Sequence, residues 1–192
     1  MDIVSYLLGK NASGGGDGLN WSALGLENPP KSLQNAYNYS LDIKNNWVPA
    51  TFLKEKFRND YNLIFAPLID TSIATNMNGF FQSCYSLIKI PLLDTSNVTN
   101  IGAFCSGCYG LKEIPILDIS KATIIGNMFN NCPSLTDESL DNILQMCIEA
   151  NAYTGTKELK QIGITSVYYS ATRIQALPHY QDFINAGWTI GY

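Results

Sequence analysis

Apolar positions recur every 24 residues through the middle of the chain, and this period predicts how that part folds. The stretch "IKIPLLDTSNVTN" at residues 88–100 returns as "KEIPILDISKATI" at residues 112–124, and a weaker copy, "IFAPLIDTSIATN", occupies residues 64–76. A period of this length that holds over several units is typical of repeat proteins. The middle of the chain is therefore predicted to consist of units that bury their apolar faces against one another.

Each unit reads L-x-x-I-P-x-L-D-x-S, which predicts one short strand followed by a turn. Strands of successive units would lie parallel and about 4.8 Å apart, so residues one period apart would form columns. Proline lacks a backbone donor, so Pro67, Pro91 and Pro115 should mark the ends of the strands. The predicted fold class is an α/β solenoid: a short leucine-rich-repeat stack with parallel strands, helical N- and C-terminal caps and a tethered N-terminal peptide.

Several columns of side chains follow from the period and are predicted to be structural. The main leucine, cysteine and aspartate columns are Leu63, Leu87, Leu111 and Leu135; Cys84, Cys108 and Cys132; and Asp70, Asp94 and Asp118. Further buried columns are expected from Ile90 with Ile114, from Phe80 with Phe104 and Met128, and from Leu68 with Leu92 and Ile116. Because no unit can bury its own face, these columns are expected to hold the units together.

Both ends of the chain lack the clear period and are predicted to cap it. The apolar spacing of "NPPKSLQNAYNYSLDIKNNW" and of "TDESLDNILQMCIEA" predicts a helix in each stretch, and further helices are expected over residues 167–177 and from Pro178. The predicted organisation is residues 1–18, docking peptide and glycine-rich linker; 19–62, helical N-cap with a degenerate repeat; 63–134, three 24-residue leucine-rich repeats; and 135–192, helical C-terminal cap.

The first residues form a short apolar segment on a flexible linker. Its apolar side chains are Ile3, Val4, Tyr6, Leu7 and Leu8. The linker "SGGGDG" at residues 13–18 separates this segment from the rest of the chain. A core element would not need such a tether, so docking onto a partner is predicted, with a role in the core as the alternative.

Composition and charge narrow the classes of function. The net charge is −4 with only 12 Lys and Arg residues, so no basic surface for nucleic acid is expected. The sequence has no run of about 18 apolar residues that would insert into a membrane, and its start lacks the basic region and cleavage site of a secretory signal. We therefore expect a protein made in a cytoplasm, without nucleic-acid binding or membrane insertion.

Candidate chemistry is sparse in this sequence. "CSGC" at residues 105–108 has the spacing of redox or zinc sites, but a zinc site needs a second pair and the chain has one histidine. Buried, reduced thiols are predicted instead, and no metal or other cofactor is expected. The histidine, His179, is predicted to be structural or on the surface, since no nucleophile motif or phosphate-binding loop accompanies it.

Two columns are candidates for function. Asp70, Asp94 and Asp118 are predicted to accept hydrogen bonds in their turns, with calcium binding and paired acid–base catalysis as alternatives. Tyr85 and Tyr109 lie one period apart and, if exposed, would form a face for carbohydrate or protein, with partly buried packing as the alternative. No catalytic residue is predicted, so the chain is expected not to be an enzyme.

The phrase F-x-x-C-x-S-L-x-x-I-P-x-L-D-T-S-x-V-T-N, which is fullest in "LLDTSNVTNIGAFCSGCYGL", resembles the BspA-like leucine-rich repeat, also found in Mycoplasma-lipoprotein-type surface repeats. The match covers Leu63 to Leu135, with departures at Ala74, Ala122 and Cys105. The resemblance implies a surface protein that binds host proteins or cells. Similar repeats occur in phage structural proteins, and both ends of this chain look like phage tail, fibre or head-fibre proteins.

The resemblance therefore predicts a bacteriophage virion structural protein, a tail or head fibre or decoration protein, that displays the repeat surface for host attachment. Its partners would be other virion proteins, bound through the N-terminal peptide, and a host cell-surface protein or glycan, with self-association into a homo-oligomer as a further option. The predicted location is the virion, after synthesis in the host cytoplasm. The alternatives are a BspA-like adhesin on the bacterial cell surface and, less favoured, a glycan-active enzyme.

Overall fold

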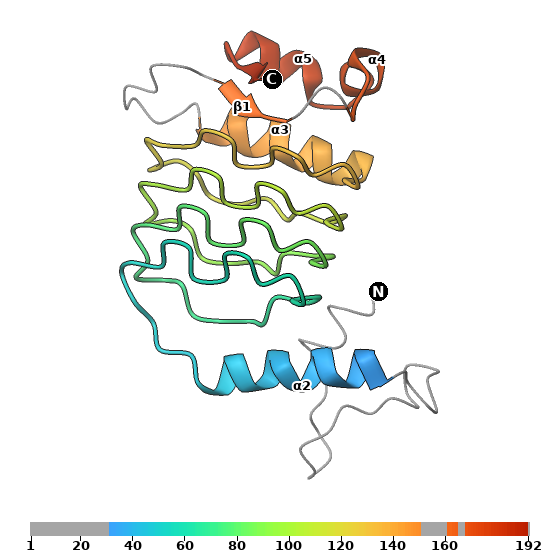
Figure 1. The fold of residues 1–192 in the computed structure, drawn as a ribbon. Coiled ribbons are helices and arrows are strands. Elements are labelled where there is room, and N and C mark those ends of the chain that lie inside the picture. Colours follow the sequence, from blue (N-terminus) through green and yellow to red (C-terminus); the bar gives the residue numbers. More distant parts are fainter. Residues whose placement is uncertain (1–30, 151–160, 165–167, 192) are drawn as a thin grey trace, which may run out of the picture.

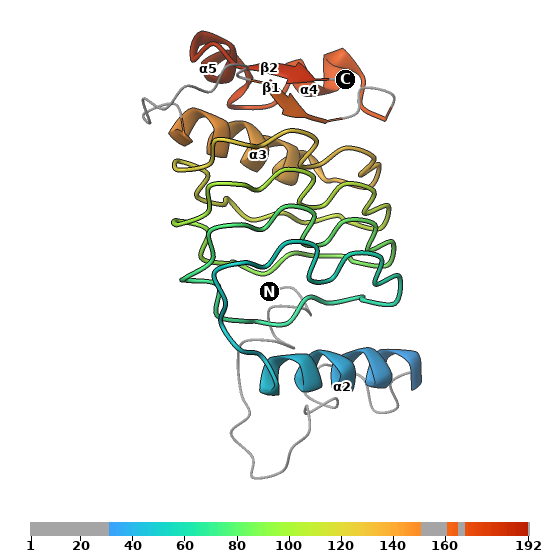
Figure 2. The same cartoon turned by 60° about the vertical axis from the view of Figure 1, so that its left-hand side comes forward.

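The computed structural model describes residues 31–150, 161–164 and 168–191. Its helices and strands are α2 Lys31–Asn45, α3 Asp137–Ala150, β1 Gln161–Gly163, α4 Ala171–Gln175, α5 Tyr180–Asn185 and β2 Thr189–Gly191. The 24-residue units lie between α2 at one end of the molecule and α3 towards the other, and the two strands with α4 and α5 lie beyond α3 (Figures 1 and 2).

The predicted fold class, an α/β solenoid built as a leucine-rich-repeat stack with parallel strands, is wrong. The regular secondary structure of the described residues is four helices and one open, two-stranded parallel sheet. That sheet belongs to the C-terminal region, where Gln161 pairs with Thr189 and Ile162 with Ile190. Residues 46–136, all of which are described, contain turns and isolated bridges but no strand.

Turns with left-handed backbone lie on either side of each predicted strand, and the predicted strand itself forms only a single bridge. Ser83, Ala103 and Asn127 have φ angles of 61°, 52° and 59°. A residue in that region redirects the chain, so an extended run does not continue through it. Within the predicted strand, the proline two residues after the bridging residue has no N–H to extend the pairing. Single bridges remain at a 24-residue step, from Phe65 through Lys89 to Glu113 and from Phe52 through Asn76 and Asn100 to Ile124.

Backbone hydrogen bonds join each unit to the next. The Phe81 N–H donates to the Phe104 carbonyl and the Cys105 N–H to the Met128 carbonyl, each at 2.8 Å. Threonine hydroxyls add to these contacts, each donating at 3.0 to 3.2 Å to the carbonyl 24 residues earlier: Thr75, Thr99 and Thr123. Equivalent residues of neighbouring units are therefore held in register.

One hydrophobic cluster fills the units and continues into the C-terminal region. Leu87 and Leu111 are fully buried, and the other leucines of the predicted column, Leu63 and Leu135, are at most 2% exposed. Phe80 and Phe104 are also fully buried, with ring centroids 5.9 Å apart. Burial of one such apolar side chain stabilises the fold by about 1.5–3 kcal/mol, so the cluster is the main source of stability.

The predicted buried column of Leu68, Leu92 and Ile116 is wrong. Leu92 is 71% exposed and Leu68 is 37% exposed, and Ile116 is only partly buried. Leu93 and Leu117 are buried in their place. Successive side chains of an extended segment point to opposite sides, so the residue directly after the proline points outward and the next one points inward.

Helix α3 covers the last unit and satisfies its open backbone groups. The Ser139 hydroxyl accepts from the Ile114 N–H at 3.0 Å and donates to the Lys112 carbonyl at 2.9 Å. The Asn142 amide donates to the Ile114 carbonyl at 2.8 Å. The helix begins after Thr136, whose hydroxyl accepts from the Ser139 N–H, the arrangement of an N-terminal cap.

Helix α2 and the segment that follows it attach to the first unit through aromatic residues. The Trp47 indole N–H donates to the Asp70 carbonyl at 2.8 Å, and the Trp47 ring lies 6.0 Å from the ring of Phe57. The Tyr39 hydroxyl donates to the Asp60 carboxylate. Partial burial and that hydrogen bond raise the pKa of Tyr39 to about 12.

Two leucine substitutions separate the interior from the surface of the units. Leu111→Ala should lower the free energy of unfolding by about 2–5 kcal/mol, because it leaves a cavity in the cluster. Leu92→Ala makes the same chemical change at a side chain that is 71% exposed, and should alter stability by less than about 0.5 kcal/mol. Urea unfolding of both variants measures the difference, and equal losses would contradict the assignment of Leu92 to the surface.

Candidate binding surface

Three exposed tyrosines, Tyr61, Tyr85 and Tyr109, form a row along the units, and we call them the tyrosine row. They are 48%, 44% and 46% exposed. The ring centroids of Tyr61 and Tyr85 are 4.7 Å apart, and those of Tyr85 and Tyr109 are 5.1 Å apart. The sequence prediction included Tyr85 and Tyr109 but missed Tyr61, although Tyr61 stands one 24-residue step earlier.

The residues next to each tyrosine fix the position of the row. The thiols of Cys84 and Cys108, each directly before a tyrosine, donate at 3.1 and 3.0 Å to carbonyls 27 residues earlier. The N–H of Gly110 donates to the Tyr85 carbonyl at 3.0 Å, and a Cβ at position 110 would lie only 2.9 Å from that oxygen. A larger residue there would push Tyr85 and Tyr109 apart, so the close approach requires glycine.

Rings that stack on one another present their edges and hydroxyls to solvent. The ring planes of Tyr61 and Tyr85 are inclined by 26°, and those of Tyr85 and Tyr109 by 48°. Each hydroxyl both donates and accepts hydrogen bonds, and each ring offers apolar area with little side-chain entropy to lose on binding. The tyrosine row is therefore suited to a partner that carries polar groups along an extended surface.

A second exposed row lies on the same units. It consists of Leu68 and Leu92, continues into the partly buried Ile116, and has the aspartates of the predicted column two residues further along the chain. Leu93 is buried between Leu92 and Asp94, so the exposed leucine and the exposed aspartate flank an inward-pointing residue. This part of the unit surface is mixed apolar and acidic.

The aspartates act within their own turns. Asp70 accepts from the Ser72 hydroxyl at 2.7 Å and the Ser72 N–H at 2.9 Å, and Asp94 makes the same two contacts with Ser96. These hydrogen bonds lower the pKa of Asp70 and of Asp94, and the bond from the serine hydroxyl contributes more than the bond from the serine N–H. Asp118 accepts from the Ser120 N–H at 2.9 Å. Within the part of the chain that the structure describes, no group of three or more His, Cys, Asp or Glu residues is arranged to hold a metal ion.

All five cysteines are free and buried. Burial raises the pKa of Cys84, Cys105 and Cys132 well above the ordinary value of a thiol. A buried thiol that stays protonated is a poor nucleophile and a poor metal ligand. The cysteine column therefore acts through packing and through the thiol-to-carbonyl hydrogen bonds.

His179 joins two helices of the C-terminal region. Its ring Nδ1 lies 2.7 Å from a carboxylate oxygen of Asp141 on α3, and its backbone N–H donates to the other oxygen at 2.9 Å. His179 directly precedes α5, so this pair of contacts ties α5 to α3. The His179 imidazole and the Asp141 carboxylate are thereby engaged in holding the two helices together.

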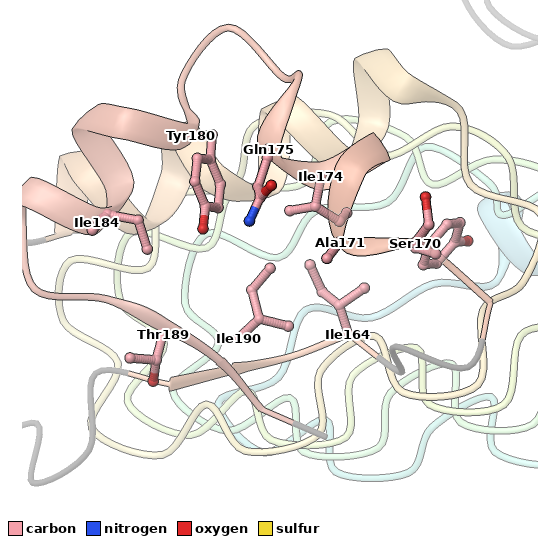
Figure 3. Close-up of a pocket in the computed structure, with 10 residues that line it drawn as sticks. Ile164, Ser170, Ala171, Ile174, Gln175, Tyr180, Ile184, Thr189 and Ile190 are labelled. Atoms are coloured by element: carbon pink, nitrogen blue, oxygen red, sulfur yellow. The ribbon is translucent and has the colours of Figure 1, made fainter.

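The C-terminal region contains a pocket of about 430 Å³ that the sequence pattern did not indicate. Figure 3 shows Ile190 of β2 and Ile164, which follows β1, on one side of it, and residues of α4 and α5 on the other. The lining comes from segments spread over residues 164–190, and none of them belongs to the 24-residue period. No single motif could therefore have marked this pocket.

The predicted docking residues Ile3, Val4, Tyr6, Leu7 and Leu8 lie outside the described part of the chain. None of the helices described is long and apolar enough to cross a membrane.

No protein-family model matches the chain, and neither a curated protein nor a solved structure matches it. The functional argument therefore rests on the residues and their arrangement.

Tyr169 ties the C-terminal region to the last unit. Its hydroxyl donates to the Cys132 carbonyl and accepts from the Leu135 N–H, the latter at 3.0 Å. The ring is buried, and the guanidinium of Arg173 lies 5.0 Å from its centre. Burial raises the pKa of Tyr169 to about 12.

The alkaline limit of stability should depend on Tyr169. The pKa of an unfolded tyrosine is about 10, so the stabilisation is complete below that pH and is lost as the pH rises towards 12. Tyr169→Phe should lower the free energy of unfolding near neutral pH by about 1–3 kcal/mol, because buried backbone groups lose their partner. Between pH ~9 and ~11, the variant should lose less stability than the wild type.

Urea unfolding at a series of pH values measures both effects. Tyr168→Phe is the matched control, because Tyr168 is 41% exposed, and it should follow the wild type throughout. Parallel loss of stability in the wild type and in Tyr169→Phe at alkaline pH would show that another group is responsible.

Proposed function

We propose that the chain is a structural component of a bacteriophage virion, a fibre or decoration protein, and that the tyrosine row attaches the particle to the host surface. In this proposal the N-terminal apolar segment holds the chain on the particle. The observation that carries the binding role is the row of three exposed rings, 4.7 and 5.1 Å apart, on a hydrogen-bonded scaffold. The resemblance of residues 63–135 to surface-protein repeats supports the virion setting.

Binding suits the described side chains better than catalysis does. The thiols are buried, which keeps them protonated, and Asp70 and Asp94 are engaged by the serines of their own turns. His179 is engaged by Asp141 between two helices. These thiols, carboxylates and the imidazole thus have structural partners, whereas the tyrosine row repeats one exposed side chain from unit to unit.

A host cell-surface glycan or protein is the partner class that suits the tyrosine row. Tyrosine hydroxyls provide donors and acceptors at regular intervals, and the rings provide apolar contact between them. With a net charge of −4, the chain offers no general attraction to polyanions, so recognition relies on these neutral groups.

A bacterial cell-surface adhesin would use the same tyrosine row in a different location. The resemblance to BspA-like repeats favours both settings, because such repeats occur in bacterial surface proteins and in phage structural proteins. Location, rather than binding, therefore separates the two functions.

We expect the chain in purified phage particles, at a level that mass spectrometry detects against the capsid proteins. Deletion of residues 1–18 should abolish incorporation, because the apolar segment is removed, while the remaining chain keeps its folded circular-dichroism spectrum. A variant that keeps these residues but carries Tyr85→Ala should be incorporated normally and is the control. Absence from particles together with recovery from the bacterial cell surface would favour the adhesin instead.

The double variant Tyr85→Ala with Tyr109→Ala should weaken binding of the purified chain to host cells about tenfold or more, since exposed tyrosines commonly dominate such interfaces. Tyr168→Ala removes an equally exposed tyrosine outside the row and should leave binding unchanged. Flow cytometry with fluorescently labelled protein measures both. Full binding by the double variant would remove the tyrosine row from the proposal.

A further inference from the structure

The pocket of the C-terminal region is a concave, mostly apolar space. Isoleucines line it from several elements: Ile164 beside β1, Ile174 of α4, Ile184 of α5 and Ile190 of β2. Its volume of about 430 Å³ falls within the range of about 300–1,000 Å³ that is usual for small-molecule sites. The pocket therefore has the size and surface of a ligand site and is separate from the tyrosine row.

Two polar groups face this space without a partner. In Figure 3, the hydroxyl of Tyr180 and the amide of Gln175 point towards the space above Ile190. Among the described residues, no hydrogen bond joins either side chain to another residue; Tyr180 is partly buried, and Gln175 is exposed to solvent. A hydroxyl and an amide each donate and accept, so together they would serve a ligand group that does both.

The other polar groups around the pocket are already engaged. The Ser170 hydroxyl accepts from the Arg173 N–H at 3.2 Å, and the Tyr169 hydroxyl is shared between two backbone groups of the last unit. The hydroxyl of Tyr180 and the amide of Gln175 therefore remain available to form hydrogen bonds with a ligand.

Among the lining residues that the structure describes, no side chain carries a charge. The nearby cation, Arg173, is paired with Asp137 at 2.6 Å and also donates to the Leu135 carbonyl at 3.1 Å. A charged ligand would lose its hydration here without gaining an opposite charge, which is unfavourable. The chemistry of the pocket thus selects against carboxylates and ammonium groups.

We propose that this pocket binds a small, neutral molecule with an apolar ring or chain and one hydroxyl or amide group. The apolar part would lie against the four isoleucines, and the polar group would bond to Tyr180 and Gln175. This site is independent of the proposed attachment function, because its residues lie outside the 24-residue units.

Nuclear magnetic resonance of the full chain with labelled isoleucine methyl groups tests the proposal. The probe is acetanilide, which is neutral and joins an aromatic ring to an amide; benzoate and benzylammonium are charged probes of similar size. Acetanilide should shift the methyl signals of Ile174 and Ile190 and leave that of Ile101, which is buried in the units, unchanged. The charged probes should bind at least tenfold more weakly.

Conservative variants locate the polar contact. Tyr180→Phe removes one hydroxyl and should raise the Kd for acetanilide about two- to tenfold, which is the loss of one hydrogen bond. Tyr168→Phe makes the same change at an exposed tyrosine outside the lining and should leave the Kd unchanged. The Ile101 methyl signal reports whether each variant is folded, and the comparison of neutral with charged probes requires no variant.

Three results would overturn the proposal. The first is the absence of methyl shifts with acetanilide up to its solubility limit. The second is equal binding of acetanilide and benzoate, which would show that the pocket does not select for neutral ligands. The third is an equal effect of Tyr168→Phe and Tyr180→Phe, which would show adventitious binding at the surface only.

Discussion

The hydrogen bonds that join each unit to the next are the constraint on which the rest of the structure depends. Contacts such as the one from the Phe81 N–H to the Phe104 carbonyl leave little freedom in how neighbouring units are placed. Residues one period apart are thereby brought to equivalent positions, inward or outward. The apolar cluster inside and the tyrosine row outside are two results of the same backbone arrangement. A buried backbone group without a partner is unfavourable, so this register is also the arrangement that the chain favours energetically.

The turns of the units explain why this register does not produce a sheet. Turns at positive φ, as at Ser83 and Ala103, bound the extended run of each unit, and the proline within that run withholds the donor that would lengthen a ladder. The units therefore rely on side chains to complete their contacts. Threonine hydroxyls and buried cysteine thiols both donate to carbonyls of the preceding unit. A short polar side chain at a fixed place in each unit thus performs part of the role that strand pairing performs elsewhere.

The period in the sequence was sufficient to identify equivalent positions, but it did not determine the backbone conformation at those positions. Leu87 and Leu111 are equivalent and are both buried, and helices are present at Lys31–Asn45 and Asp137–Ala150, where apolar spacing predicts them. The predicted strands are absent, because pairing at positions such as Lys89 is limited to a single bridge and the proline two residues later cannot extend it. In the run Pro91-Leu92-Leu93, the period alone does not show which leucine points inward. The C-terminal pocket is lined by several short segments within residues 164–190 that share no period, so it emerges only from the fold.

Helix α3 has a consequence for the behaviour of many copies held close together. An uncovered final unit would expose a row of unpaired backbone groups, which is a template for association between molecules. Ser139 and Asn142 occupy those groups on Lys112 and Ile114 with hydrogen bonds of their own. Copies concentrated on one surface would therefore meet through side chains instead of joining edge to edge. Ser139 and Asn142 thus oppose edge-to-edge association at this end of the units.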